Sequence, residues 1–220
     1  SPYVEYEGNP NLLPSYTNTI SASANLKKWS LNASVYESKN PIGFGLFYDE
    51  TKNISKFTTQ NFDKEIGASL GVDVPFEYKI LNSQNSLSLN YSKTEDSLAI
   101  VHKSTPYVYL YTNNTIKLGK GFNFLLDASW LTKRTQGLYE YNEMLLVNLG
   151  LTKSVSNFDF TLRYNDVFKQ NVFIQQFSYE KIITKGTFYG NTPVFSVGVK
   201  YNFGKVSNSE YKEKQINETM

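Results

Sequence analysis

Hydrophobic and polar residues alternate with a period of two along most of this chain of 220 residues. The pattern is clearest near the C-terminus, where one set of alternate positions is wholly apolar: Phe195, Val197, Val199, Tyr201 and Phe203. The positions between them hold small or polar residues. Because successive side chains of a β-strand point to opposite faces of a sheet, this pattern predicts strands with one apolar and one polar face.

The alternation predicts nine strands, which follow one another along the chain: 15–26, 29–48, 54–75, 83–101, 105–118, 121–135, 140–153, 156–181 and 187–204. Several are longer than the five or six residues of a typical globular strand. Segment 107–118 follows the pattern less well, because Thr112 and Asn114 interrupt its apolar face. Aromatic residues make up 15% of the chain and charged residues 19%, a composition that favours strands over helices. We therefore expect an all-β protein.

The predicted connections between these strands fall into two classes. Four are short and turn-like: 27–28, 75–81, 119–121 and 154–157. The others are longer and polar: 49–53, 102–104, 135–139 and 184–192. A meander with tight turns at one end and longer loops at the other is typical of bacterial outer-membrane barrels, whose short turns face the periplasm.

A soluble β-sandwich would also alternate, and the mean hydropathy of −0.41 is compatible with one. Two features favour a membrane instead. The polar face is rich in Ser, Gly, Asn and Thr, and aromatic residues stand near strand ends like an interfacial girdle: Trp29, Phe122, Phe158, Tyr201 and Phe203. An all-β chain spans a membrane only as a closed barrel, because lipid offers no partner to an open sheet edge. We expect a transmembrane antiparallel up-and-down β-barrel of the bacterial outer membrane, in contact with outer-membrane lipid.

Composition argues against several other classes of protein. Lys and Arg number 22 and Asp and Glu number 20, so the net charge of +2 shows no excess that would attract a nucleic acid. Cysteine is absent, which excludes disulfides, thiolate metal sites and cysteine nucleophiles. The sequence contains no recognisable set of nucleophile, base and orienting residue. We expect neither catalysis nor a cofactor.

The number of predicted strands is odd, whereas single-chain bacterial barrels have an even number. If the last strand runs to the periplasm, the first predicted strand also does, and residues 1–14 begin on the extracellular side. We therefore expect the chain to be the C-terminal portion of a larger barrel, with the remaining strands supplied by the parent chain or by another chain. The alternative is that residues 3–7 form a tenth strand. Residues 205–220 are expected to be a solvated periplasmic tail.

Three segments resemble a known family of barrels. Residues 8–14, GNPNLLP, resemble the GNPNLKPE element of TonB-dependent receptors, from which Leu13 and Ser15 depart. Residues 165–169, NDVFK, resemble that family's break in the penultimate strand, and residues 196–204, SVGVKYNFG, resemble its closing strand. The style of the sequence is most similar to the outer-membrane β-barrel proteins of Bacteroidetes-type bacteria.

The resemblance implies the last nine strands of a 22-stranded barrel, normally filled by an N-terminal plug. It implies import of a scarce nutrient, such as a siderophore, vitamin, glycan or peptide, with energy supplied by the TonB system through the plug. In this interpretation residues 1–14 are an extracellular lead-in and residues 15–204 hold the barrel strands. No plug is recognisable in this sequence.

The final strand is the strongest candidate site, because the closing strand of the family is read by the barrel assembly machinery. Its apolar stripe would serve both as that signal and as a lipid-facing surface: Phe195, Val197, Val199, Tyr201 and Phe203. Four charged residues fall on the opposite, lumen-facing positions, where they could contact a plug, set pore selectivity or pair with one another: Asp127, Asp159, Arg163 and Lys200.

The remaining candidates have simpler interpretations. His102, the only histidine, is expected in a loop without catalytic partners. Residues 119–121, Gly-Lys-Gly, lack the spacing of a phosphate loop and predict a tight turn. Acidic pairs in the loops could bind a cation, although solvated loop charges are the commoner case: Asp49 with Glu50, and Glu95 with Asp96.

Two other functions remain open at the level of sequence. The chain could be a barrel of this kind that no longer transports and instead serves as a structural or assembly subunit of an outer-membrane complex. It could also be a soluble β-rich binding or adhesin module. A plug on the parent chain would favour transport, and partition into the aqueous phase without detergent would favour the soluble module.

Overall fold

The computed structural model of the chain describes residues 4–97, 104–179 and 182–203. These residues form sixteen strands in three sheets, which confirms the all-β prediction. Within the described ranges, no helix has the length and apolar character needed to cross a membrane. The predictions for His102 and for the tail 205–220 lie outside the described residues.

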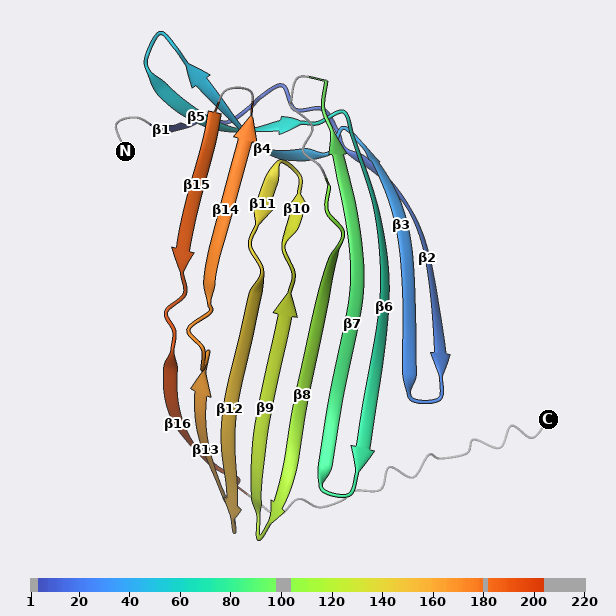
Figure 1. Cartoon of the computed structure of the whole chain (residues 1–220), viewed down its shortest axis with the longest axis vertical. Coiled ribbons are helices and arrows are strands. Elements are labelled where there is room, and N and C mark those ends of the chain that lie inside the picture. Colours follow the sequence, from blue (N-terminus) through green and yellow to red (C-terminus); the bar gives the residue numbers. More distant parts are fainter. Residues whose placement is uncertain (1–3, 98–103, 180–181, 204–220) are drawn as a thin grey trace, which may run out of the picture.

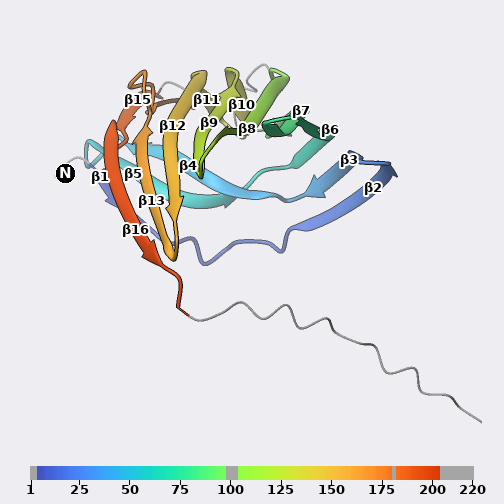
Figure 2. The same ribbon diagram turned by 90° about the horizontal axis from the view of Figure 1, so that it is seen from below.

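The largest sheet has nine strands, and every pair of antiparallel neighbours in it follows from the chain order of the predicted segments. In spatial order they are β2 (Tyr16–Leu26), β3 (Trp29–Lys39), β6 (Lys64–Tyr78), β7 (Leu81–Glu95), β8 (Tyr107–Gly119), β9 (Phe122–Leu131), β12 (Met144–Val155), β13 (Phe158–Asn165) and β16 (Val194–Tyr201). They form a tall curved wall (Figure 1), which is an arc when viewed along its strands (Figure 2).

Four hairpin turns of two residues lie together at the lower end of the wall in Figure 1: Lys27-Lys28, Lys79-Ile80, Lys120-Gly121 and Ser156-Asn157. The first residue of each has a positive φ, between 49° and 58°, which matches the backbone twist that two-residue hairpins need. The predicted turn at 75–81 is too long, because β6 continues to Tyr78 and pairs there with Leu81. Phe76 and Tyr78 continue its outward apolar face, which is why the strand does not end at Pro75.

The predicted long strands break near the upper end of the wall, and their upper parts form two small sheets. β1 (Val4–Tyr6), β5 (Ile54–Asn61) and β4 (Ile42–Asp49) form one, and β10 (Arg134–Gln136), β11 (Tyr139–Tyr141), β14 (Val172–Tyr179) and β15 (Ile182–Tyr189) form the other. The loop predicted at 184–192 is wrong, because β15 continues to Tyr189, which pairs with Val172 of β14. The breaks coincide with backbone that strands do not adopt: Asn40 has a φ of 52° and precedes Pro41, and Asp166 has a φ of 53°.

The buried apolar core of the described chain lies between the two small sheets. Phe62, Leu138 and Phe177 are at most 5% exposed, and Phe57 and Tyr139 pack against them. The rings of Tyr139 and Phe177 are 5.0 Å apart. The β4–β5 hairpin therefore leaves the wall and crosses its concave side at the upper end (Figure 2), where the sequence pattern predicted a simple continuation of the strands.

The N-terminal segment belongs to this upper region. β1 pairs in parallel with β5 rather than with the wall, so the described part of the segment predicted at 3–7, Val4–Tyr6, is not a tenth barrel strand. Two side chains hold the GNPNLLP element. Asn61 accepts a hydrogen bond from the Leu13 N–H at 2.7 Å and donates one to the Leu13 carbonyl at 2.9 Å, and Asn9 donates to the Thr59 carbonyl at 3.0 Å. Asn61 also donates to the Asn40 carbonyl. This element thus leads the chain from the upper end into β2.

Candidate functional site in the barrel wall

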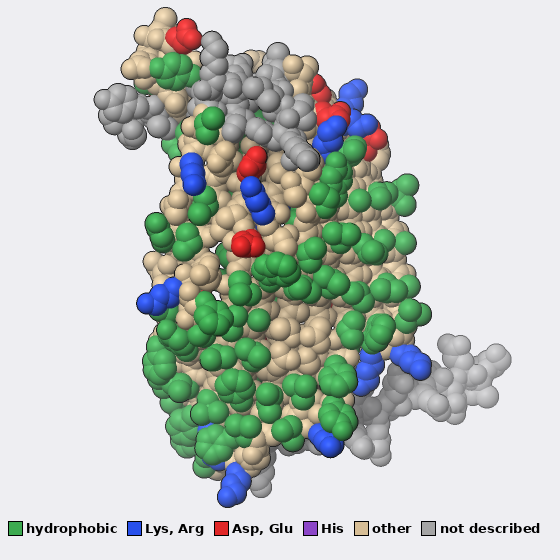
Figure 3. Space-filling model, in the orientation of Figure 1, with side chains coloured by type: hydrophobic (Ala, Val, Ile, Leu, Met, Phe, Trp, Pro, Cys, Tyr) green, Lys and Arg blue, Asp and Glu red, His purple; other side chains and the backbone are tan. Residues whose placement is uncertain are grey.

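The convex face of the wall is apolar and exposed. Hydrophobic side chains cover most of the face shown in Figure 3, and many are more than a third exposed: Ile20, Val35, Leu70, Leu87, Leu89, Leu110, Trp130, Leu145, Phe160 and Leu162. In water so large an apolar surface would drive association. The same surface is what the hydrocarbon core of a bilayer requires.

Aromatic residues gather on this face near the two-residue turns. They are Trp29, Phe76, Tyr78, Phe122, Phe158, Phe160, Tyr201 and Phe203. Several touch one another across strands, as in the 4.7 Å separation of the Phe158 and Tyr201 rings. This belt includes the five aromatic residues that the sequence placed at strand ends, and its position matches an interfacial girdle.

A closed ring of hydrogen bonds interrupts the apolar face between β7 and β8. Ser83 Oγ donates to Asn114 Oδ1 at 2.6 Å, and Asn114 Nδ2 donates to Thr112 Oγ1 at 2.8 Å. Thr112 Oγ1 donates to Asn85 Oδ1 at 2.8 Å, and Asn85 Nδ2 donates to Ser83 Oγ at 2.9 Å, which closes the ring. The Asn85 amide also donates to the Val74 carbonyl, and the Asn114 amide also donates to the Leu126 carbonyl. The four side chains therefore satisfy one another's hydrogen-bonding groups on a face that offers no water.

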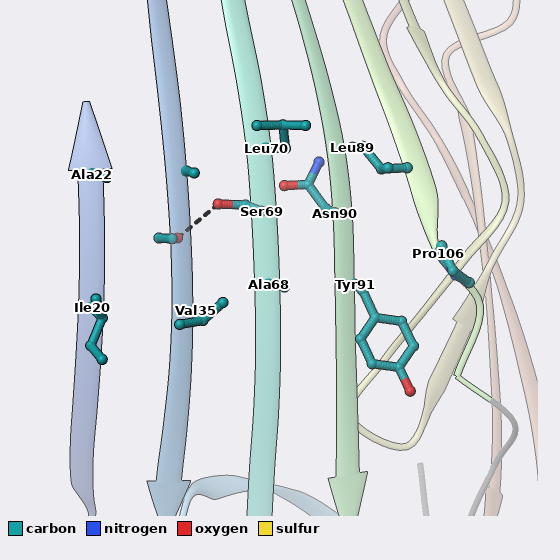
Figure 4. Close-up of a pocket in the computed structure, with 12 residues that line it drawn as sticks. Ile20, Ala22, Val35, Ala68, Ser69, Leu70, Leu89, Asn90, Tyr91 and Pro106 are labelled. Carbon is teal, nitrogen blue, oxygen red and sulfur yellow. Dashed lines mark hydrogen bonds between the residues drawn. The ribbon is translucent and has the colours of Figure 1, made fainter. Parts of the chain in front are cut away.

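An apolar hollow of about 410 Å³ opens on the convex face over β2, β3, β6 and β7 (Figure 4). Ala22, Ala33 and Ala68 form it, because their side chains are shorter than those of Ile20 and Leu70 beside them. A hydrogen bond of 2.8 Å between Ser34 and Ser69 joins β3 to β6 on the opposite face. The hollow is open and almost wholly apolar, so lipid acyl chains fit its chemistry.

The concave face is polar and dominated by short side chains. Hydroxyl groups join neighbouring strands along it, as between Thr17 and Ser38 at 2.7 Å. Near the upper end, Glu65 accepts hydrogen bonds from the Tyr36 hydroxyl at 2.7 Å and from the Thr94 hydroxyl at 2.8 Å. The inward positions of β8 carry three tyrosines, Tyr107, Tyr109 and Tyr111. Sequence reasoning did not single these out, although their spacing of two residues marks them as one face.

Two of the predicted lumen-facing charges form an ion pair. Arg163 Nη1 lies 3.4 Å from Asp127 Oδ2 and reaches it across β12. Gly150 occupies the crossing point, where a Cβ would lie 3.4 Å from Arg163 Cγ and 3.2 Å from Leu125. Asp127 also accepts a hydrogen bond from the Asn113 amide. The absence of a side chain at Gly150 thus leaves the room through which the arginine passes.

The other two predicted charges lie at the lower end of the concave face. Asp159 accepts hydrogen bonds from the Ser154 hydroxyl at 2.7 Å and from the Asn202 amide at 2.9 Å. Lys200 stands opposite Asp159 in the register of β13 and β16. The wall therefore holds the four charges in two separate groups, and both groups take part in contacts between strands.

The closing-strand residues occupy the edge of the wall. Phe195, Val197, Val199 and Tyr201 lie on the outward face of β16, and Phe203 follows the strand; their exposed fractions run from 42% to 88%. Among the described residues β16 pairs with β13 alone, so its second edge has no strand beside it. An unpaired edge with an apolar face can add to another sheet by strand pairing.

In each acidic pair of the loops, at least one carboxylate is bound by the protein's own groups. Asp49 accepts hydrogen bonds from the Thr51 hydroxyl at 2.5 Å and from the Lys52 N–H at 3.2 Å, and Lys56 lies 3.4 Å away. These contacts lower the pKa of Asp49 to about 2, with the Thr51 hydroxyl as the largest cause. Glu95 pairs with Lys93 at 2.5 Å. Among the described residues no group of three metal-ligating side chains comes together.

The break between β13 and β14 lies beside β12 and is organised around Asp166, which is only 2% exposed and whose N–H donates to Asn148 Oδ1. Its carboxylate accepts hydrogen bonds from the Gln170 and Asn171 N–H groups and from the Thr192 hydroxyl. Burial acts to raise the pKa of Asp166, but these three donors outweigh it and hold the pKa below its usual value. Asp166 therefore ties the break between β13 and β14 to the break between β15 and β16, where the family-like segment NDVFK predicted an interruption.

The curved antiparallel sheet, its apolar convex face, its aromatic belt and its polar concave face together define the wall of an outer-membrane-type β-barrel. In agreement, the sequence model of the outer membrane protein β-barrel family matches residues 1–201, and the chain belongs to this family. Membership implies a location in the bacterial outer membrane. A search of curated proteins and a search of solved structures found no significant match.

Proposed function

We propose that this chain forms part of the wall and the extracellular loops of an outer-membrane importer similar to TonB-dependent receptors. The observation that carries the proposal is the direction of the two edge strands. β2 ends at the turn Lys27-Lys28, and β16 also runs toward the turn end (Figure 1). Two strands that run the same way are not antiparallel neighbours, so closing this wall into an antiparallel barrel takes further strands.

A larger barrel has room for a lumen and a plug, whereas a small one fills with its own side chains. The concave face of the wall supports the larger form, because it is polar and dominated by serine rather than packed with large apolar groups. In this proposal the complete barrel has 22 strands. The substrate is a scarce nutrient, and the energy comes from the TonB system through a plug.

The proposal assigns no catalytic role to the wall. The acidic and basic residues of its concave face bond to neighbouring strands, as Asp127 does with Arg163 and Asp159 with Ser154. Their positions suit contact with a plug or with a passing solute.

Growth under nutrient limitation tests the import function. A strain without the gene is grown where iron, a vitamin or a glycan limits growth, with and without a functional TonB system. We expect a defect on at least one nutrient, restored by the wild-type gene only when TonB is present. Normal growth on every nutrient, together with loss of other proteins from the outer membrane, would replace import with the structural-subunit function.

The closing strand is proposed to be read by the barrel assembly machinery. Replacing Tyr201 and Phe203 together by Ala removes the aromatic end of the exposed stripe, and we expect less protein in the outer membrane. Leu26 and Leu118 at other strand ends, also replaced by Ala, are the matched control. Heat-modifiable migration of outer-membrane fractions measures insertion, and equal insertion of both variants would show that β16 carries no separate signal.

A further inference from the structure

Lysine residues are concentrated at the turn end of the wall. Counting the four two-residue turns and three residues on either side of each, six lysines stand against two acidic residues, Glu77 and Asp159. The lysines are Lys27, Lys28, Lys79, Lys117, Lys120 and Lys153. In Figure 3 the acidic side chains lie in the upper half of the face shown, and the lower rim shows only basic ones.

The two acidic residues neutralise little of this charge. Glu77 lies 3.8 Å from Lys28, but both side chains are more than 60% exposed, and such a pair is weak in water. Asp159 is turned to the concave face, where Ser154 and Asn202 donate to it. Lys117 also stands at an inward position, opposite Asn123, so the outward rim carries the turn lysines and Lys153 and is positively charged.

These lysines stand beside the aromatic belt of the convex face. Lys79 Nζ is 5.0 Å from the centre of the Tyr78 ring, and Lys153 Nζ is 4.1 Å from the centre of the Phe122 ring. Lys153 also donates to the Lys120 carbonyl in the neighbouring turn. Aromatic rings mark the depth at which lipid headgroups begin, so the ammonium groups lie at the level of the lipid phosphates.

We propose that the lysine–aromatic rim at the turn end binds anionic phospholipid headgroups of the leaflet in which it lies. The partner is a lipid surface rather than a free phosphate, because the same side chains that present the charge continue directly into the acyl-facing wall. Basic residues next to a membrane surface are attracted to anionic lipids, each by an amount that adds to the others. The rim binds anionic lipids in preference to uncharged ones, whereas the rest of the barrel surface does not distinguish them. This preference does not depend on the import function.

The test compares lipid selectivity of the full-length protein in phosphatidylcholine vesicles that contain a trace of spin-labelled lipid. Electron paramagnetic resonance gives the association of labelled phosphatidylglycerol relative to labelled phosphatidylcholine. We expect the wild-type protein to prefer phosphatidylglycerol by about threefold or more. Equal association of the two lipids would overturn the proposal.

The decisive variant replaces Lys27, Lys79 and Lys120 by Asn and Lys28 by Gln. Asn is chosen at the first three positions because their φ is positive and Asn adopts that conformation readily. We expect the preference to fall to near one. The matched control removes four lysines from the opposite end, Lys52, Lys133, Lys169 and Lys185, and keeps the preference. A turn variant that retains the wild-type preference would contradict the proposal.

The salt dependence of the lipid preference tests the same proposal without any variant. At about 0.5 M NaCl the interaction between exposed charges is screened over a few ångströms, so the wild-type preference for phosphatidylglycerol is expected to disappear. A labelled phosphatidylglycerol fraction that stays bound in salt would mean that the rim does not act through its lysines. Addition of inorganic phosphate at the same ionic strength is expected to change nothing beyond the salt effect, which separates a lipid surface from a phosphate site.

Discussion

Ser83, Asn85, Thr112 and Asn114 place four polar side chains on the face that lipid covers. A single substitution, Asn114→Leu, removes the acceptor of the Ser83 hydroxyl and the donor to the Thr112 hydroxyl oxygen in an apolar medium. We expect it to lower the free energy of unfolding by about 1–3 kcal/mol. Replacing all four by apolar residues of similar size removes every partner together and is expected to cost much less. Unfolding in lipid or detergent, followed by heat-modifiable migration, measures both.

The sequence showed Thr112 and Asn114 as interruptions of an alternating pattern and gave no sign of their purpose. Their partners lie on β7, 27 or more positions away, and only the register of β7 with β8 brings them together. Equal stability of the single and the fourfold variants would show that the ring is not a closed unit.

Gly150 gives a second prediction at the residue scale. A valine there meets Leu125 and the stem of Arg163, so Gly150→Val is expected to destabilise the wall by about 1–3 kcal/mol and to separate Arg163 from Asp127. Gly198 is the matched control, because its added Cβ meets only Thr161, at 3.8 Å. Gly198→Val is expected to be neutral. The unfolding free energies of the two variants are compared. Equal values would show that Arg163 does not require the space left at Gly150.

The hydrogen bonds to Asp49 make the stability of its turn depend on pH. Its folded pKa of about 2 lies below the unfolded value of 3.8, so its contribution to stability is fully present above about pH 4 and is lost as the pH falls through 2. Titration of the Asp49 carboxyl carbon by NMR checks the midpoint, and Asp49→Asn abolishes the titration while leaving the neutral-pH fold. A midpoint at or above 3.8 would contradict the hydrogen bonds from Thr51 and Lys52.

At the scale of elements, the nine wall strands were predictable because one face of each is apolar and alternation has a fixed period. The upper strands were not, because alternation continues through β4 and β5 after they leave the wall. The one local signal was Asn40-Pro41, a pair that breaks strands. The core formed by Phe62, Leu138 and Phe177 joins segments more than a hundred residues apart, which no local pattern encodes.

The GNPNLLP element yields a prediction about its anchor. Asn61→Ala removes the hydrogen bonds to the Leu13 N–H and carbonyl and the one to the Asn40 carbonyl. We expect faster proteolysis of residues 8–14 on whole cells, with the wall unchanged. Asn18→Ala, on the exposed outward face of β2, is the control. Unchanged cleavage of the Asn61 variant would show that β1 and the hydrogen bond from Asn9 to the Thr59 carbonyl hold the segment without Asn61.

At the scale of the whole molecule, the convex and concave faces could be assigned from the sequence, and so could three of the four short turns. The four charges named from the sequence lie on the concave face of the wall, and their grouping could not be predicted, since it depends on which strands are neighbours. A place for the wall in the outer membrane requires one physical statement to hold, that its convex face meets lipid.

Cysteine labelling in intact outer membranes tests that statement most directly, because the chain has no cysteine of its own. Leu70→Cys and Leu89→Cys mark the convex face, and their neighbours Ser69→Cys and Ser88→Cys mark the concave face. We predict that a charged maleimide labels the two serine positions and leaves the two leucine positions unreacted, while a lipid-soluble reagent labels the leucine positions. Charged-reagent labelling of the leucine positions as fast as the serine positions would contradict the membrane wall.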